Sequence, residues 1–311
     1  MALHPSATSG FNFKVSRNDV ITLSLPDPFS FTETLHYLRR SPLEILHQVE
    51  GESVYKLLEV DGEKRLIEVS ACQNGEELFV RFLDQFPADP AVVADYLAEW
   101  FDLRRDLNAF YESVSCNSIL APLIEKHNGL RVIGVPDLFE ALCWAVIGQQ
   151  VNLPFAYTVK KRFVEAYGEH LDRKDRRYWL FPKPERVAML EAEDLRELQL
   201  TQRKAEYIIS IANMMADGSL SKSDLLELEG DQSEKKLLAI RGIGPWSAHY
   251  VLMRCLRDPS AFPIGDAGLH NALKHILGRE KKPTYDEIRK IFAPWQGWEA
   301  YAVFYLWRSL G

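Results

Sequence analysis

The chain has 311 residues, of which 47% are apolar and 26% are charged, and its formal net charge is −7. These values are typical of a soluble globular protein with two or three packed units. No apolar run approaches the ~18 residues of a membrane span, which excludes a membrane-spanning segment. Four widely spaced cysteines make a disulfide framework unlikely and favour a reducing, cytoplasmic compartment.

The first 88 residues predict a flexible tail followed by a small sheet domain. Residues 1–10 lack the charged and apolar regions of a signal peptide and predict the tail. Residues 11–88 predict an antiparallel sheet with one or two helices, because strand-like runs alternate with turn dipeptides such as Asp61-Gly62. The runs begin at Val20, Val54, Lys64 and Glu77. The segment 29–49 has helical spacing.

After residue 90 the composition becomes helical, so the fold class is predicted to be α+β. The helices are expected near residues 91–111, 117–127, 138–150, 153–167, 186–190, 192–198, 202–215 and 233–238, from 245 and 267 onward, and twice in 285–310. The polar segment 168–185 carries a charge run and is expected to be a solvated loop.

A glycine-containing turn, residues 241–244, joins two of these expected helices. Gly242 and Gly244 allow unusual backbone angles and expose amide groups, and Pro245 suits the first position of the second helix. Exposed amides at a helix N-terminus attract phosphate. Between residue 241 and the C-terminus, ten Lys and Arg outnumber six Asp and Glu, which permits a basic face beside the turn. The turn therefore predicts a phosphate clamp.

Asp266 follows Trp246 by 20 residues and precedes an apolar helix predicted over 267–277. Aspartate is a preferred N-cap, and a helix N-terminus stabilises its ionised form. Cleavage of an N-glycosidic bond develops positive charge on the sugar, which an ionised carboxylate stabilises. Capping is therefore the predicted role of Asp266 from the residues alone, and a capping carboxylate is compatible with catalysis.

Several segments together resemble one superfamily of base-excision DNA glycosylases, defined by a helix-hairpin-helix and a Gly/Pro-rich loop with an aspartate (HhH-GPD). Within it the chain most resembles the bacterial DNA-3-methyladenine glycosylase II branch. The resemblance covers residues 90–311 well and the first 90 loosely. It rests on 129–132, 139–151, 203–212, 237–250, 262–266 and 298–307. It implies an all-helical two-lobed body: 89–130 with 259–311 carry the aspartate, and 131–258 carry the hairpin.

The resemblance also implies the activity. Lyase-competent members carry a nucleophilic lysine where this chain has Trp246, and tryptophan supplies no amine. We therefore expect a monofunctional glycosylase that hydrolyses alkylated, cationic purines such as 3-methyladenine and 7-methylguanine from double-stranded DNA. Asp266 would stabilise the oxocarbenium-like state or activate water.

The resemblance further places Trp246, Tyr250 and Trp298 around the base pocket, where aromatic faces attract a cationic base. Trp246 and Tyr250 share a helix face, and without the resemblance such a pair usually indicates core packing. Trp295 is assigned either to the pocket rim or to packing, and Trp307 to the core. His249 is expected to be a surface or backbone-contact residue.

The target base must leave the DNA stack, and family members fill the gap with a side chain that is commonly leucine in this branch. Here the matching residue is Gln150, whose alternative role is a polar helix end. The resemblance implies phosphate binding by Arg241, Gly242, Ile243 and Gly244, with a monovalent cation on their carbonyls. No iron–sulfur cysteine cluster, zinc spacing or other cofactor is expected. A monomer, associated with the nucleoid through DNA, is expected.

Two rival functions stay open. One is a glycosylase for oxidised or deaminated bases, against which Trp246 in place of lysine weighs for the 8-oxoguanine lyase type. The other is a non-catalytic helix-hairpin-helix DNA-binding module, which would need neither the aspartate nor the aromatic residues.

Overall fold

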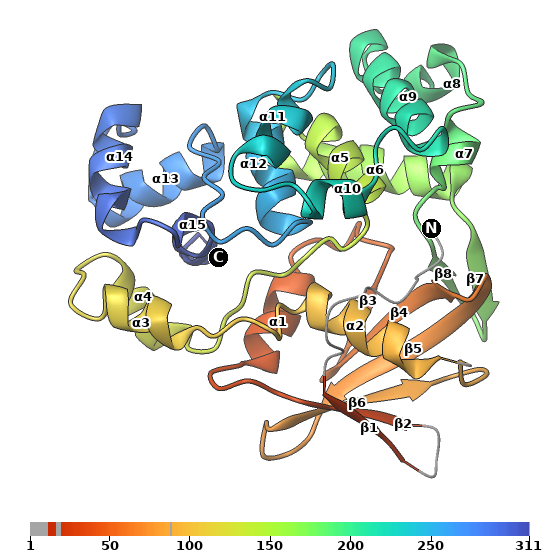
Figure 1. Cartoon of the computed structure of the whole chain (residues 1–311), viewed down its shortest axis with the longest axis horizontal. Coiled ribbons are helices and arrows are strands. Elements are labelled where there is room, and N and C mark those ends of the chain that lie inside the picture. The colour runs from red at the N-terminus through yellow and green to blue at the C-terminus, as the bar shows by residue number, and fades with distance from the viewer. Residues whose placement is uncertain (1–11, 17–19, 88, 311) are drawn as a thin grey trace.

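The computed structural model describes residues 12–16, 20–87 and 89–310. The predicted flexible tail, residues 1–10, lies outside the described residues. An antiparallel sheet forms the lower part of the molecule in Figure 1, and a body of helices lies above it. The predicted α+β class is confirmed. No helix among the described residues combines the length and apolar character needed to cross a membrane.

The main sheet has six antiparallel strands in the order β1-β2-β6-β5-β4-β3. One row of side chains crosses four of these strands, because Val80 pairs with both Ile21 and Val69, and Val69 pairs with Val54. All four are fully buried in the main core. The strands are β1 (Phe13–Val15), β2 (Val20–Ser24), β3 (Gln48–Glu50), β4 (Ser53–Val60), β5 (Glu63–Ala71) and β6 (Glu77–Phe82).

Four of the six strands match the predicted runs, whereas β1 and β3 were not predicted. Both have only three residues, too few to show an alternating pattern. The segment predicted as helical over 29–49 contains one shorter helix, α1 (Phe31–Leu38), before β3. Pro42 follows the helix end closely, and proline disfavours helical angles in the residue before it.

The helical body follows the predicted spacing except at residues 91–111, at the unpredicted helix 222–226 and in the segment 168–185. The helix expected over 91–111 is two helices, with Asp102 between them at a φ of +53° that a helix does not accept. The helices up to the hairpin are α2 (Pro90–Trp100), α3 (Asn108–Val114), α4 (Leu120–Lys126), α5 (Leu138–Ile147), α6 (Leu153–Tyr167), α7 (Pro184–Val187), α8 (Ala192–Arg196), α9 (Gln202–Ala216), α10 (Lys222–Leu226) and α11 (Gln232–Leu238). The later helices are α12 (Pro245–Arg254), α13 (Ala267–Ile276), α14 (Tyr285–Phe292), a short 3₁₀ turn (Ala293–Trp295) and α15 (Glu299–Arg308).

The prediction that residues 168–185 form a loop is wrong. The segment contains a two-stranded hairpin, β7 (His170–Arg173) and β8 (Arg176–Trp179). Its charges lie mostly towards the tip, while Tyr178 is buried with Leu57 and Leu66 of the main sheet. Burial of the aromatic end against the sheet outweighs the polar composition, so the body is not entirely helical.

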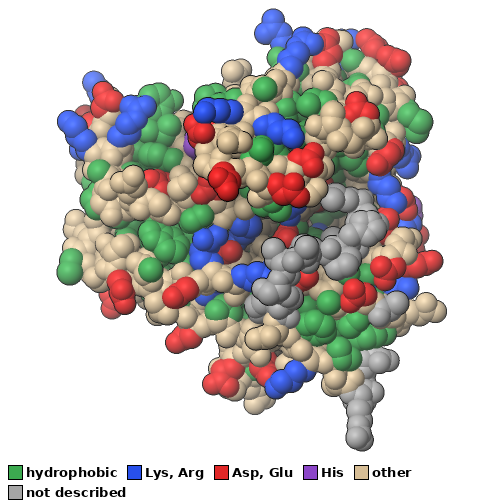
Figure 2. All heavy atoms as spheres, in the orientation of Figure 1, with side chains coloured by type: hydrophobic (Ala, Val, Ile, Leu, Met, Phe, Trp, Pro, Cys, Tyr) green, Lys and Arg blue, Asp and Glu red, His purple; other side chains and the backbone are tan. Residues whose placement is uncertain are grey.

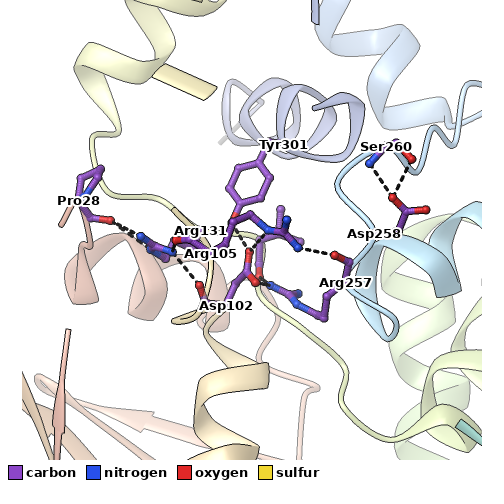
Figure 3. Close-up of polar contacts among 9 residues, drawn as sticks. Pro28, Asp102, Arg105, Arg131, Arg257, Asp258, Ser260 and Tyr301 are labelled. Atoms are coloured by element: carbon purple, nitrogen blue, oxygen red, sulfur yellow. Dashed lines mark hydrogen bonds and ion pairs between the residues drawn. The ribbon is translucent and has the colours of Figure 1, made fainter. Parts of the chain in front are cut away.

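A buried polar network joins the end of α12 to α15 (Figure 3). The carboxylate of Asp102 forms an ion pair of 2.9 Å with Arg257, just after α12, and accepts a hydrogen bond from Tyr301 of α15. The fully buried Arg131 donates 2.7 Å hydrogen bonds to the backbone carbonyls of Asp102 and Arg105. Arg131 also donates to Pro28, so the network fastens the sheet domain to the helical body.

Candidate functional site

The carboxylate of Asp266 lies at the N-terminus of α13 and accepts three hydrogen bonds. Its Oδ1 accepts from the Leu269 amide at 2.8 Å, which makes Asp266 the N-cap as predicted. The same oxygen accepts from Nε1 of Trp307 at 2.8 Å. Oδ2 accepts from Nε1 of Trp246 at 2.9 Å. A carboxylate offers about four lone-pair positions, so one acceptor position on Oδ2 is left for a substrate or water.

The loop before Asp266 is fixed by two histidines. His249 of α12 accepts a 3.0 Å hydrogen bond from the Phe262 amide through Nδ1, which confirms its predicted contact with the backbone. A ring nitrogen of His270 lies 2.9 Å from the Ile264 carbonyl. The carboxylate is therefore held by the loop as well as by the helix, which favours a preorganised site.

Trp246 and Tyr250 lie on one face of α12, as their spacing predicts. Their ring centroids are 5.8 Å apart, and the planes are tilted by 34°. Trp246 is half-buried beside the carboxylate, whereas Tyr250 is only 4% exposed. Burial raises the pKa of Tyr250 to about 12, so its hydroxyl is protonated at neutral pH. The structure thus brings these two predicted pocket residues together with Asp266.

Of the three tryptophans in the C-terminal segment, Trp307 and Trp298 are placed differently from expectation, and Trp295 takes one of its two expected roles. Trp307, assigned to the core, is half-buried and bonded to Asp266. Trp298 lies at the other end of α15, about 13 Å along the helix, and packs against Phe110. The structure therefore does not bring Trp298 to the carboxylate. Trp295 is fully buried, which decides between its two assignments in favour of packing.

Side chains of α1, α12 and α15 form a ring of pairwise contacts that begins and ends at Asp266. From Trp246 it passes through Tyr250 to Arg254, whose guanidinium lies over the Tyr250 ring at 5.4 Å. From Trp307 it passes to Phe304, with ring centroids 6.0 Å apart. Tyr37 of α1 contacts both series of residues. Its ring centroid lies 4.7 Å from that of Phe304 and 5.3 Å from the Arg254 guanidinium.

The side chains in this ring of contacts differ in burial. Tyr250, Arg254 and Phe304 are each at most 4% exposed. Asp266, Trp246, Trp307 and Tyr37 are half-buried and partly open to solvent. Tyr37 belongs to the sheet domain, for which no site residue was predicted. Trp307 and Phe304 are three residues apart on one helix, and this aromatic spacing could have indicated that α15 contributes to the site.

The glycine turn joins α11 and α12 in the predicted helix-hairpin-helix form. Gly242 has a φ of +93°, and a Cβ there would meet the Tyr207 ring at 2.3 Å, so the position requires glycine. Gly244 is the N-cap of α12, and Pro245 is its first residue. The exposed Arg241 lies over the Tyr207 ring and is 3.3 Å from Glu206. On the face drawn in Figure 2, acidic and basic side chains are interspersed over the helical body.

The loop between α5 and α6 is tied to this turn by Gln149, which was not singled out from the sequence. Its amide nitrogen donates to the Gly242 carbonyl at 2.8 Å and to Ser247 Oγ at 3.0 Å. Lys204 donates to two carbonyls of the same loop, at Ile147 and Gln149. Gln150 is exposed, with a φ of +55°. The predicted wedge residue thus lies on a loop that is fixed to the glycine turn.

Metal binding was expected only as a monovalent cation on the turn carbonyls. Two of these carbonyls already accept hydrogen bonds, Gly242 from Gln149 and Gly244 from the Ala248 amide. Each keeps a second lone pair, so the donor set fits weak cation binding. Within residues 12–16, 20–87 and 89–310, no group of three or more His, Cys, Asp or Glu side chains could hold a metal ion.

Comparisons with known proteins show the family to which the chain belongs. The family model described as HhH-GPD superfamily base excision DNA repair protein matches residues 143–297, and the model of the AlkA N-terminal domain matches residues 20–137. A DNA-3-methyladenine glycosylase of Bacillus subtilis is 46% identical over 94% of this chain and 98% of that protein.

Solved structures share the fold at lower identity. A 3-methyladenine DNA-glycosylase from Archaeoglobus fulgidus has a TM-score of 0.80 and 21% identity, covering 92% of this chain and 97% of that one. An 8-oxoguanine glycosylase/lyase of Clostridium acetobutylicum has a TM-score of 0.71 and 16% identity, covering 97% and 100%. At these identities the likeness shows the fold alone.

The sheet domain, the hairpin and the capped aspartate thus define a protein of base excision repair. The chain belongs to the HhH-GPD superfamily of base excision DNA repair proteins, and within it to the group of the DNA-3-methyladenine glycosylases.

Proposed function

We propose that this protein is a monofunctional DNA glycosylase that removes alkylated, cationic purines such as 3-methyladenine and 7-methylguanine from double-stranded DNA. The observation that carries the proposal is the Asp266 carboxylate, which is held by two indole N–H groups and a helix amide and flanked by the half-buried rings of Trp246 and Trp307. The relative from Bacillus subtilis, named a DNA-3-methyladenine glycosylase, supports the substrate class.

Asp266 acts on the sugar of a nucleotide that has rotated out of the duplex. The bond between C1′ and the base nitrogen breaks, and its electron pair leaves with the base. The positive charge that develops on the sugar is stabilised by the carboxylate, whose Oδ2 keeps a free acceptor position. A water oxygen then bonds to C1′, and its proton passes through the carboxylate to solvent.

Trp246 argues against the lyase route. The family resemblance places it where lyase-competent members carry a nucleophilic lysine, and its indole nitrogen carries no nucleophilic lone pair. The reaction therefore ends at an abasic site with an intact strand.

The aromatic walls suit a cationic base. Trp246 and Trp307 are half-buried and lie on either side of the carboxylate. Each aromatic face attracts a cation by roughly 0.5–2 kcal/mol. A cationic base is also a good leaving group, so the site needs no strong general acid.

DNA is held by the turn at residues 241–244 and by the α5–α6 loop that Gln149 ties to it. The turn amides bind backbone phosphate, and Gln150 enters the stack in place of the rotated nucleotide. We expect the protein to act as a monomer in the cytoplasm. Sedimentation with and without DNA would test the monomeric state.

The decisive experiment compares base release from methylated DNA by the wild type and by Asp266→Asn. The amide keeps the size of the side chain but lacks the negative charge, so release of 3-methyladenine and 7-methylguanine is expected to fall at least a hundredfold, about 2.7 kcal/mol. Asp286→Asn on the exposed surface of α14 is the matched control and keeps full activity.

DNA affinity of the two proteins should match, because the carboxylate does not bind phosphate. Equal release by wild type and Asp266→Asn would refute the catalytic role. A protein adduct trapped by borohydride would refute the monofunctional assignment. A preference for oxidised or deaminated bases, or DNA binding without any base release, would support one of the two rival functions.

A further inference from the structure

The first turn of α6 presents an apolar surface to solvent. Its residues Leu153, Pro154 and Phe155 are consecutive and exposed, and the exposed fraction is 50% for Leu153 and 37% for Phe155. The buried side of the helix begins only at Ala156. Single exposed apolar side chains are ordinary, whereas a contiguous group commonly marks a contact surface. We call residues 153–155 the α6 apolar turn.

The α6 apolar turn is held in one conformation. The side chain of Asn152 accepts a 2.9 Å hydrogen bond from the Phe155 amide, and Oγ1 of Thr158 donates to the Pro154 carbonyl at 3.0 Å. The proline ring restricts the backbone further. A surface that is already ordered loses little conformational entropy on binding, so its apolar contacts contribute more of their free energy to affinity.

Two contacts place this turn beside the candidate site. A Cβ at Gly148 would lie 3.5 Å from the ring of Trp246, which donates to Asp266. The next residue, Gln149, donates to the Gly242 carbonyl of the glycine turn. Leu153 follows Gln149 by four residues, which span at most about 14 Å, or about four base-pair steps of a duplex. DNA that is held at the glycine turn is therefore within reach of the α6 apolar turn.

The chemistry of the α6 apolar turn fits bases and not phosphates. Leu153, Pro154 and Phe155 carry no charge and no side-chain donor, so they offer nothing to a phosphate oxygen. Proteins that deform DNA insert such side chains between base steps. Rotation of a nucleotide out of the duplex exposes the faces of its neighbours, which creates an apolar surface that was absent from the intact stack.

We propose that the α6 apolar turn is a second DNA contact, in which Leu153 and Phe155 pack against the bases beside the rotated nucleotide while Gln150 occupies the vacated position. This inference rests on the proposed function. The polar Gln150 stacks weakly, and the apolar turn three residues later supplies the stacking that it lacks. Because the base faces are exposed only in the opened duplex, the contact favours opened DNA over intact DNA.

The test compares the affinity for two duplexes of one sequence. One contains a tetrahydrofuran abasic-site analogue, which is opened without any base release, and the other is undamaged. We expect Leu153→Ala and Phe155→Ala each to lower the affinity for the abasic duplex by about tenfold, since a stacking contact with a base has this magnitude. The affinity for the undamaged duplex should not change. Phe155→Leu, which keeps an apolar side chain, should bind nearly as well as the wild type.

The exposed Val15 of β1 supplies the matched control. Its exposed fraction of 46% is close to that of Leu153, and β1 lies in the sheet at the opposite end of the molecule from the upper helices in Figure 1. Val15→Ala should bind both duplexes as the wild type does. A general effect of removing an exposed apolar side chain would appear in this control as well.

The dependence of affinity on salt tells an apolar contact from a displaced phosphate contact. Leu153→Ala removes no interaction with phosphate, so the slope of log affinity against log salt should equal that of the wild type. A flatter slope, or an equal loss of affinity for both duplexes, would show that the substitution moved the glycine turn, and this would overturn the proposed contact.

The remaining outcomes separate this inference from the proposed function. Wild-type affinity of both alanine variants for the abasic duplex would overturn the inference, assign the α6 apolar turn to a partner other than DNA, and leave the glycosylase assignment standing. A wild type that does not prefer the abasic duplex and releases no base would instead remove the proposed function. Should an alanine variant melt at a lower temperature, Leu153→Gln keeps the length and helix propensity of the side chain and decides in the same way.

Discussion

Nε1 of Trp307 and Oδ1 of Asp266 are joined by a 2.8 Å hydrogen bond across the 41 residues that separate them. Together with Nε1 of Trp246 on the other oxygen, this bond fixes the plane of the carboxylate. The two tryptophans that pack beside Asp266 therefore also orient its charged group.

Replacing Trp307 by phenylalanine keeps an aromatic wall but removes the donor to Asp266. We expect Trp307→Phe to lower the rate of base release by about tenfold, because a hydrogen bond to a charged group contributes roughly 1.5–3 kcal/mol. Single-turnover kinetics on methylated DNA measure the effect. DNA affinity and the melting temperature should change little.

The buried Trp295 supplies a contrasting tryptophan for this prediction. Its indole nitrogen is buried without a hydrogen-bond partner among the described residues. Trp295→Phe should therefore cost about 1–3 kcal/mol of stability through lost packing and leave the release rate of the folded enzyme unchanged. If both variants lose activity equally, the bond from Trp307 has no special role.

The two glycines of the turn differ in what they tolerate. Gly242→Ala forces a Cβ against the Tyr207 ring at an unfavourable φ of +93°, whereas a Cβ at Gly244 meets nothing within 4 Å. We expect Gly242→Ala to weaken DNA binding at least tenfold and to reduce stability by more than about 1 kcal/mol. Gly244→Ala should change stability by less than about 0.5 kcal/mol.

Binding isotherms at several salt concentrations measure this difference. A turn that binds phosphate gives an affinity that falls steeply with salt, and the slope should flatten in Gly242→Ala. A variant that keeps the wild-type affinity and slope would show that the turn does not contact DNA.

Local sequence signals predicted the helical half of the site well. The turn, the start of α12 at Pro245 and the Asp266 cap depend on backbone preferences of neighbouring residues, and each was located correctly. The helix boundaries of α6 were also predicted, because Asn152 caps it and Pro154 fits its first turn.

Long-range contacts could not be predicted in the same way. Tyr37 reaches the site only because the sheet domain docks on the helical body through Arg131 and Asp102. Trp298 and Trp307 are tryptophans at opposite ends of α15, and only the tertiary structure shows which of them contacts Asp266. The β7–β8 hairpin was missed because its burial depends on a distant sheet.

Gln150 is the predicted wedge, and its surroundings allow the side chain to be tested without disturbing the loop. The loop backbone is held by Gln149 and Lys204, so substitutions at the exposed position 150 should leave the loop in place. Gln150→Ala is expected to reduce base rotation, seen as 2-aminopurine fluorescence beside the lesion, and to slow release by about tenfold. Gln150→Leu should show the fluorescence and release rate of the wild type, because an apolar side chain fills the gap in the stack.

The exposed Gln85 of the sheet domain provides the control, and Gln85→Ala should match the wild type. Wild-type fluorescence and release in Gln150→Ala would assign the wedge to another residue.

Asp102 makes the stability of the fold depend on pH, and this dependence is separate from any effect of pH on catalysis. Burial raises the pKa of this carboxyl, but Arg257, Arg105 and the Tyr301 hydroxyl outweigh burial and hold the pKa below its usual 3.8. A lowered pKa in the folded state means that the ionised form stabilises the fold. This stability is complete above pH 3.8 and is lost as the pH falls through the folded-state pKa.

Asp102→Asn should therefore reduce the free energy of unfolding by about 3–5 kcal/mol at pH 7, since Arg257 loses its buried partner. The difference between wild type and variant should stay constant from pH 7 to 5 and shrink below pH 4, where the wild-type carboxyl also becomes neutral. Urea unfolding across this pH range measures it, with Asp286→Asn as the exposed control. A difference that grows towards low pH would contradict the sign of the pKa shift and with it the stabilising role of the Asp102 network.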